Sequence, residues 1–381
     1  MSAEEEFYLM RPPVHVVEGL DDHYQQMIND AEQQMISHGL HTYMQAVYER
    51  CDAKDEWLYD IPHPARKRWA GFVPIHHELM VQEHEAVALL MTRMSRKQVR
   101  VQDLVYDLME RSPSFKELVM MGNTDKSSNN LGALDPMFHP HVHLAKGGRL
   151  FKISDERAAM LMKADMIDNA PAGLLRMPYP NVFIHAKPGF TINNPVSGDH
   201  EVDGFYVNHY IVAGEHVKRD WDEQFKGDNR YWLNKFLAEK GILTKDGGDI
   251  HGFEIVAMGR PKDSIFDDAT FSFGINVQNP NQTLDEVFNA HIEHYQTRTE
   301  ARPNTDGLKY VNATDMHAEQ MRKSLAFVLK SLLYINSQDT DKERIMELSD
   351  LKRERRITSM SAKKRKLDRK IAYASDYTLI K

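Results

Sequence analysis

The sequence predicts an α+β fold: a helical N-terminal half, then a mixed or antiparallel sheet of about five strands with packing helices, and a basic C-terminal tail. Apolar residues at helical spacing dominate residues 20–121, whereas short strand-like runs between turn residues dominate residues 182–277. Lysine and arginine then gather in residues 352–370. We divide the chain into a mainly helical region (1–121), a linker (122–150), an α+β core (151–350) and a basic tail (351–381).

The N-terminal region reads as a series of helices joined by loops. Residues 20–51, 78–94 and 101–111 carry apolar side chains at helical spacing, and Ser112-Pro113 ends the last of these segments. The segment GNTDKSSNNLG (122–132) is rich in residues that favour turns, which places a boundary after the helices.

Residues 155–185 form the stretch around which the predicted core is organised. Every fourth residue from 158 to 166 is apolar, which predicts one face of a helix. Pro171 interrupts the helix because the residue before a proline disfavours helical dihedral angles. Two further prolines keep the chain extended, and the apolar run 182–184 then predicts a short buried strand that enters the sheet.

The remaining core elements follow from local patterns. Thr283 and Glu286 have the spacing of a capping box, which predicts the start of a helix. A last long helix is predicted to begin at Thr314 or Asp315. Strands are predicted at residues 190–192, 204–212, 253–258 and 270–277, with a terminal strand at 377–380.

The net charge of −8 hides an uneven distribution. Residues 352–370 contain ten Lys and Arg residues against two Asp and Glu residues, a charge of +8, so the remainder of the chain carries −16. Clustered cations attract phosphate groups, which predicts contact with RNA or the ribosome; the alternative is a solvated tail that folds back on the acidic body. The predicted nucleic-acid-binding residues are Lys363, Lys364, Arg365, Lys366, Arg369 and Lys370.

Cysteine usage and hydropathy indicate the cytoplasm. The single cysteine, Cys51, excludes an internal disulfide and fits a reducing compartment. The acidic N-terminus lacks the order of charges of a signal peptide. The most apolar run, residues 325–335, is much shorter than the roughly 20 residues that span a bilayer, so we expect no membrane contact.

Motifs for catalysis are missing, and we predict no catalytic residue and no cofactor. The sequence contains no phosphate-binding loop, no dinucleotide-binding glycine motif and no nucleophile elbow. Nineteen histidines still raise the question of metal binding. His139, His141 and His143 alternate and are the best metal candidates, but they lack a complete ligand set. A metal-dependent nuclease or hydrolase that uses histidine clusters, and a structural phage protein, remain open alternatives.

Five segments in a fixed order carry a resemblance. They read NAPAGLLRMPYPNVFIH, GFYV, FSFGINV, TLDEVFNAHI and LAFVLKSLLYINSQD, and a basic C-terminus follows them. Over about residues 154–381 the chain resembles a family of phage and plasmid proteins that includes a type V-A anti-CRISPR. The resemblance implies a cytoplasmic protein of a bacterial host cell. It also implies that the protein recognises an N-terminal polypeptide segment of a CRISPR effector nuclease during translation and causes loss of the nuclease mRNA.

The resemblance also has a departure that bears on RNA contact. Some relatives end in a segment of the form RRGHW, whereas this chain has KKRKLDRK and no tryptophan there. We therefore expect the tail to bind RNA or the ribosome by charge more than by stacking. We expect the partner polypeptide on the sheet that follows Val182, with Arg176, Tyr179, Phe183 and Tyr206 as partner-binding residues.

Overall fold

The computed structural model describes residues 60–69, 139–140, 142–143, 148–164, 169–194, 198–222, 232–261, 269–300, 313–337 and 341–380. Most of the predicted helical region, the linker segment 122–132 and His141 lie outside these residues. The described helices are α4 (His63–Trp69), α10 (Asp155–Lys163), α11 (Gly214–Arg219), α12 (Trp232–Glu239), α13 (Leu284–Glu300), α14 (Ala313–Asn336), α15 (Glu347–Ile357) and α16 (Ser361–Tyr373), with a short 3-10 helix η3 (Ala172–Leu174).

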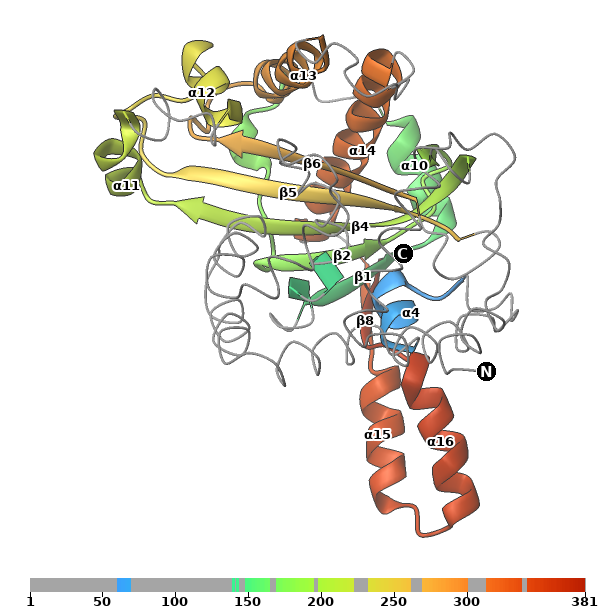
Figure 1. Cartoon of the computed structure of the whole chain (residues 1–381). Helices are drawn as coiled ribbons and strands as arrows, with labels where there is room; N and C mark the ends of the chain where they lie inside the picture. The colour runs from blue at the N-terminus through green and yellow to red at the C-terminus, as the bar shows by residue number, and fades with distance from the viewer. Residues whose placement is uncertain are drawn as a thin grey trace, which may run out of the picture.

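A mixed sheet forms the centre of the molecule (Figure 1). Its strands are β1 (Arg149–Ile153), β2 (Asn181–His185), β3 (Thr191–Asn194), β4 (Gly198–Val212), β5 (Ile250–Gly259), β6 (Thr270–Val277), β7 (Lys342–Ile345) and β8 (Tyr377–Ile380). They lie in the order β6-β5-β4-β2-β1-β8-β7, and β3 pairs with β4 beside this path. β1 runs parallel to β2 and β8, and the other pairs are antiparallel.

The α+β class is confirmed, but the expected number of about five strands is too low. In the described residues the sheet has eight strands. Two of them were not predicted: β1, which reads RLFKI, and β7, which reads KERI. Three of the four residues of β7 are exposed, so this short edge strand lacks the apolar alternation that identifies a strand in sequence.

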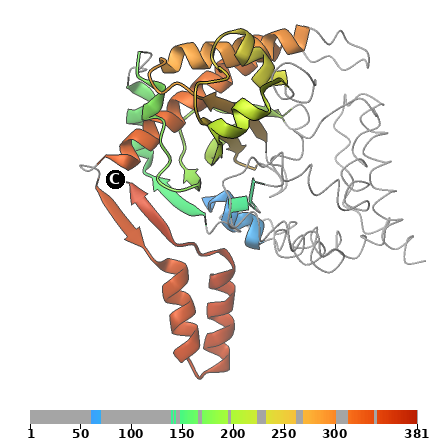
Figure 2. The same cartoon turned by 90° about the vertical axis from the view of Figure 1, so that its left-hand side faces the viewer.

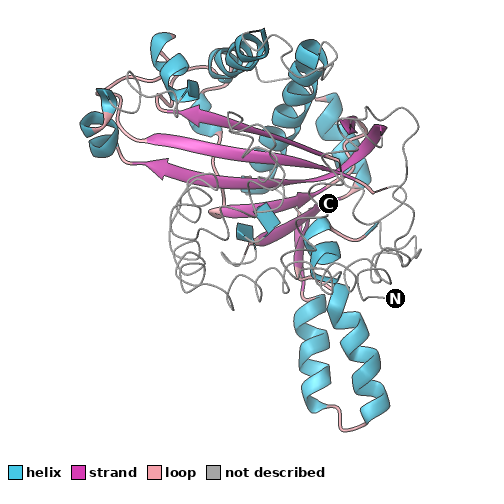
Figure 3. Cartoon of the chain, in the orientation of Figure 1, coloured by secondary structure: helices cyan, strands magenta, loops and turns pink. Residues whose placement is uncertain are grey.

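One face of the sheet is apolar and is covered by helices. Its core includes Phe151, Ile184 and Phe205 from the strands and residues of α10, α13 and α14. The rings of Phe205 and Phe327, on β4 and α14, lie 5.5 Å apart. α10 and α14 lie side by side behind the sheet (Figures 1 and 3). The helix predicted after residue 154 is therefore confirmed as α10, which ends at Lys163, before the proline.

A proline-rich crossing delivers the chain from this helix layer into β2. In it Ala172 and Gly173 donate backbone hydrogen bonds to the carbonyls of Gln282 and Pro280, at 2.8 and 2.9 Å. A Cβ on Gly173 would come within 2.8 Å of the Pro280 side chain, so only glycine fits here. The crossing leads into β2, which is buried throughout, as the sequence predicts.

The capping box at the start of α13 is also confirmed. The Thr283 backbone N–H donates to the Glu286 carboxylate at 2.9 Å, and the Glu286 backbone N–H donates to the Thr283 hydroxyl at 3.1 Å. These two bonds satisfy donors that the first turn of a helix leaves free. Local sequence alone fixes this helix start.

The basic C-terminal segment is folded. It forms the helical hairpin of α15 and α16, which projects from the body of the molecule (Figures 1 and 2). The predicted terminal strand is confirmed as β8, and it lies inside the sheet between β1 and β7. Among the helices that the structure describes, none is long and apolar enough to cross a membrane.

Candidate functional site

The projecting hairpin, here called the arm (residues 347–373: α15, α16 and the turn between them), is the first candidate site. It is inserted between β7 and β8, which pair with each other in antiparallel register from Lys342↔Ile380 to Ile345↔Tyr377. β8 also pairs with β1 through Phe151↔Thr378 and its neighbours. Because strands hold the chain on either side of the arm, its root is fixed to the sheet.

A polar clasp closes the root. The backbone N–H of Ser349 donates to the Asp376 carboxylate at 2.9 Å, and the Ser349 hydroxyl donates to the other oxygen of that carboxylate. The residue at the N-cap of α15, Met346, has no side-chain acceptor. Asp376 therefore supplies from the returning strand the acceptor that a capping side chain normally provides, and its negative charge lies at the positive end of the helix dipole.

The two helices of the arm hold each other through a thin apolar seam and charged pairs. Leu367 is buried, and Leu351 and Ile371 are half-buried on the facing sides of α15 and α16. Arg355 pairs with Asp368, and Lys363 pairs with Glu354 at 2.8 Å. The hydrogen bond from Lys363 lowers the pKa of the Glu354 carboxyl below its ordinary value. The pairs link α15 to α16, so they fix the helices side by side.

The arm is strongly basic. It contains ten Lys and Arg residues against four Asp and Glu residues, a net charge of +6. The cations of α15 thus join the residues predicted from sequence on α16. The sequence analysis counted the α15 cations in the charge of the segment but did not assign them to the site. Six cations are exposed or half-exposed and form no ion pair with the described part of the chain: Lys352, Arg356, Lys364, Arg365, Lys366 and Lys370.

Three of the predicted cations of α16 have separate positions. Lys363 is engaged with Glu354, and Lys370 is exposed and helps to lower the pKa of the Glu354 carboxyl. Arg369 belongs to α16, and its side chain lies outside what the structure describes. The structure therefore brings most of the predicted basic residues together on one projecting element.

The tip of the arm is apolar. Ile357 ends α15 and is 80% exposed, and Met360 precedes α16 and is 67% exposed. Thr358 and Ser359 lie between them. No feature of the sequence singled out these residues, because a run of charge surrounds them. The tip therefore combines exposed apolar side chains with cations on either side.

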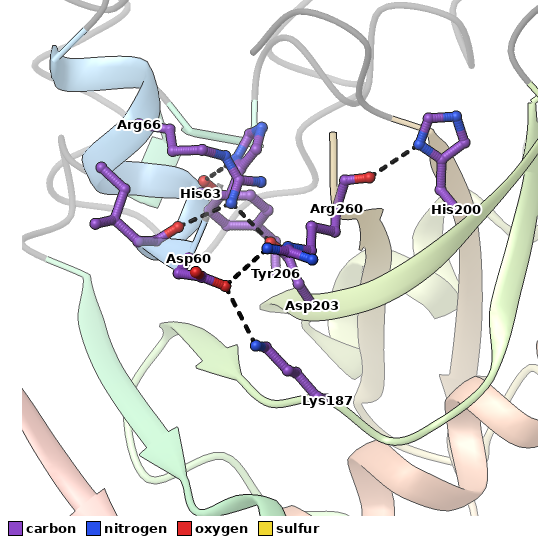
Figure 4. A network of polar contacts seen from close by, with 9 residues as sticks. Asp60, His63, Arg66, Lys187, His200, Asp203, Tyr206 and Arg260 are labelled. Atoms are coloured by element: carbon purple, nitrogen blue, oxygen red, sulfur yellow. Dashed lines mark hydrogen bonds and ion pairs between the residues drawn. The ribbon is translucent and has the colours of Figure 1, made fainter. Parts of the chain in front are cut away.

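A second candidate site is a buried polar cluster where α4 meets the other face of the sheet (Figure 4). Arg66 donates to Asp203 at 2.7 Å, and the two side chains are each only 1% exposed. Arg66 also donates to the Ile61 carbonyl at 2.8 Å. Asp203 lies at a register irregularity of β4 between Val202 and Gly204. This β-bulge allows an acidic residue inside a buried strand to face α4.

Further polar contacts surround this ion pair. The His63 ring nitrogen and the Tyr206 hydroxyl are 2.8 Å apart. At the rim, Asp60 accepts from Arg260 at 3.0 Å and from Lys187 at 3.3 Å. α4 also packs against α16. The short helix therefore connects the sheet to the base of the arm.

The predicted partner-binding residues separate into two groups. Phe183 and Tyr206 are fully buried, with ring centroids 4.6 Å apart, in the core beneath α4. In this position they have no surface to offer a partner, because the cover comes from a distant segment that their strands could not reveal. Arg176 and Tyr179 are exposed on the proline-rich crossing, and the Arg149 guanidinium lies 5.2 Å from the Tyr179 ring centroid.

The histidines of the predicted metal candidates serve packing in this structure. His139 and His143 are buried beside Tyr206, with ring centroids 6.3 and 5.6 Å from it, and His143 Nδ1 hydrogen-bonds Asn181 Oδ1 at 2.7 Å. Burial lowers the pKa of His143 to about 4. In the described residues, no group of three or more His, Cys, Asp or Glu is arranged to hold a metal ion.

Two other buried histidines follow the same principle. Burial, reinforced by the positive charges of Lys152 and Arg66, lowers the pKa of His185 to about 3. Burial also lowers the pKa of His291 to about 4, and its Nε2 accepts from the Asn276 backbone N–H at 2.9 Å. A neutral imidazole is favoured in each position because burial disfavours the charged form. These rings therefore act as neutral hydrogen-bonding core residues.

A family model matches more than half of the chain. The model of the AcrVA2-like family, described as the anti-CRISPR type V subtype A2 family, matches residues 151–381. A crystal structure of AcrVA2 is similar with 12% identity and a TM-score of 0.34, over 83% of this chain and 78% of that chain. The comparison with curated proteins found no match.

The buried ion pair yields a stability prediction. Arg66→Met leaves the Asp203 carboxylate buried without its cation and is expected to lower the free energy of unfolding by about 3–5 kcal/mol. Urea denaturation followed by circular dichroism measures this change. The double variant Arg66→Met/Asp203→Leu should recover part of the loss. Lys187→Met, which removes an exposed pair, is the matched control and should cost about 1 kcal/mol or less. Equal effects of the two single variants would contradict this assignment.

The clasp yields a prediction about local opening. Asp376→Ala removes the acceptor at the N-terminus of α15, a loss of about 1 kcal/mol, so amide hydrogen exchange in residues 347–351 is expected to accelerate about fivefold. Mass spectrometry of peptides from the arm measures this rate, with peptides of β5 as the internal reference. Asp350→Ala, which removes an exposed pair on α15, is the control. Acceleration of the same size in the control would show that Asp376 has no special role.

The buried histidines yield a pH prediction. Their pKa values in the folded protein lie below the ordinary value of about 6.5, so the unfolded chain binds protons that the folded chain refuses. The contribution of the neutral histidines to stability is therefore fully present above about pH 6.5. It is lost as the pH falls toward about 4. Between pH 7 and pH 5 we expect a loss of roughly 1–2 kcal/mol for His143. Urea midpoints across this range should vary less in His143→Gln than in the exposed control His251→Gln; parallel slopes would refute the prediction.

Proposed function

This chain belongs to the anti-CRISPR type V subtype A2 family, and we propose that it lowers the expression of a CRISPR effector nuclease by binding the polypeptide of that nuclease, nascent or complete. In this proposal the protein works in the cytoplasm of a bacterial host cell, and the arm contacts RNA or the ribosome. The consequence of binding is loss of the mRNA that encodes the nuclease, as the resemblance of residues 154–381 implies.

The observation that carries the proposal is the position of the positive charge. The arm holds a net charge of +6, while the chain as a whole carries −8. Cations that project away from an acidic body can contact a polyanion while the acidic body stays at a distance from it, which limits the repulsion between the two. The ribosome and its mRNA are the polyanions present where a nascent polypeptide appears. Charge attraction would therefore bring the protein to the place where its polypeptide partner emerges.

The polypeptide would bind at the proline-rich crossing. Arg176 and Tyr179 are exposed there, and Leu174 is 43% exposed beside them in sequence. Arginine and tyrosine are among the side-chain types that supply most of the binding energy in protein interfaces. Phe183 and Tyr206 would contribute indirectly, since their packing supports the strand that follows the crossing.

The test is ribosome co-sedimentation from a host lysate that translates the nuclease. The charge-reversal variant Lys363→Glu/Lys364→Glu/Arg365→Glu/Lys366→Glu is expected to lose most of its ribosome association, because phosphate contacts dominate such binding and weaken steeply with salt. The matched control reverses the same amount of charge at exposed cations away from the arm: Lys218→Glu/Arg219→Glu/Lys240→Glu/Lys245→Glu.

The nuclease mRNA is quantified in the same cells. The arm variant should restore the mRNA level, whereas the control should lower it as the wild type does. If the arm variant sediments with ribosomes as the wild type does at low and at high salt, the proposed role of the arm is wrong.

A further inference from the structure

We propose that the arm binds the stem of a folded RNA, and that Ile357 and Met360 insert where a bulge or loop interrupts the stem. This inference rests on the proposed contact of the arm with RNA, and it names the class of RNA and the residues that select it. Three properties of the arm support it: cations without an ion pair to the described residues, the absence of aromatic residues from positions 347–372, and its apolar tip.

The first property is charge that is available for phosphate. Six cations of the arm form no ion pair with the described residues, and they come from α15 and α16 alike. On α15, Lys352 and Arg356 are four residues apart and therefore share one face. Positive charge that is spread along two neighbouring helices can contact an extended polyanion such as the backbone of a nucleic acid. It does not match a compact anionic ligand, which needs convergent donors.

The second property, the absence of aromatic residues from most of the arm, favours an RNA stem over a single strand as the ligand. The arm has one aromatic residue, Tyr373, at the end of α16 where the arm joins the body, and residues 347–372 contain no Phe, Trp, Tyr or His. Proteins hold unpaired RNA mainly by stacking its bases on aromatic side chains, whereas they bind double-stranded RNA through shape and contacts to phosphate and sugar. An arm with cations and no aromatic platform therefore favours the regular backbone of a stem.

The third property is the apolar tip. The major groove of an RNA helix is deep and narrow, and two packed helices, each about 10 Å wide, cannot enter it. Apolar side chains do insert between base steps in distorted duplexes, with cations on the neighbouring phosphates. Ile357 and Met360 are highly exposed, and the arm places Arg356 and Lys364, which form no ion pair with the described residues, within four residues of them. Entry costs least where bases are already unstacked, as at a bulge.

The fixed root makes this contact more favourable. The clasp between Asp376 and Ser349 and the pairing of β7 with β8 hold the arm in one orientation. A binding element that is ordered before it binds loses less conformational freedom on binding. The arm therefore presents its charges and its tip together.

The experiment uses the full chain and three labelled RNAs of equal length and base composition. The first is an uninterrupted hairpin stem, the second carries one bulged nucleotide, and the third is single-stranded. Dissociation constants are measured by fluorescence anisotropy at several salt concentrations. The tip variant is Ile357→Ser/Met360→Ser, and its matched control is Met160→Ser/Ile211→Ser, which changes apolar residues that are exposed elsewhere.

The bulged stem should bind more tightly than the intact stem, and the single strand most weakly. The tip variant should lose about tenfold in affinity for the bulged stem, the effect expected when apolar side chains leave a buried position. Its affinity for the intact stem and its salt dependence should stay unchanged. The charge-reversal variant of the arm should lose affinity for every RNA, with a shallower dependence on salt.

Two results would overturn the inference. One is a single strand that binds as tightly as the bulged stem, and the other is a tip variant that binds the bulged stem as the wild type does. If charge reversal abolishes ribosome association but leaves all RNA affinities intact, the partner of the arm is a protein. That outcome also overturns the inference, while the proposed contact with the ribosome survives.

Discussion

The parallel pairing of β1 with β8 is the constraint on which the architecture of the C-terminal half depends. It joins Phe151 to Thr378 and Ile153 to Ile380, residues that are more than two hundred positions apart, and Ile380 is fully buried. Because β8 must return to the sheet, everything between β7 and β8 has to leave the sheet and come back at the same edge. A helical hairpin is a short way to do this, and it places the basic residues far from the core.

The charge distribution gives this topology its functional meaning. An unfolded segment of charge +8 attached to a remainder of −16 would be drawn onto the body by simple attraction. The sheet pairing, the Asp376 clasp and the packing of α4 on α16 oppose that collapse, because they fix where the arm leaves the body. Glu354 and Asp368 pair across the two helices of the arm, and Asp350 pairs with Arg353 within α15. The result is an element whose outer surface keeps its positive charge for a partner.

Sequence reasoning succeeded where the determinants are local and failed where they are distant. Thr283 and Glu286 define a helix start within four residues, and the apolar run at 182–184 defines a buried strand. The arm was predicted as a tail because its few apolar residues are hard to recognise among the charged ones. Leu351 and Leu367, for example, are separated by a run of cations and a turn. The helix that covers Phe183 and Tyr206, α4, was not predicted, since it comes from more than a hundred residues earlier in the chain. The basic residues of α16 were found because charge is visible without a fold.

The polar cluster beneath α4 explains how this helix is positioned between the sheet and the arm. A sheet face that carries Asp203 and Asn208 beside Phe183 is too polar for an ordinary apolar core, and it becomes stable only when each charge meets a partner. Arg66 meets Asp203, and Glu254 accepts from Asn208 at 2.7 Å. α4 therefore takes one position on the sheet, set by an ion pair that tolerates little displacement. Since the same helix packs against α16, the geometry of the buried pair also determines where the base of the arm rests. Helix α4 thus contacts both the buried ion pair on the sheet and helix α16 of the arm.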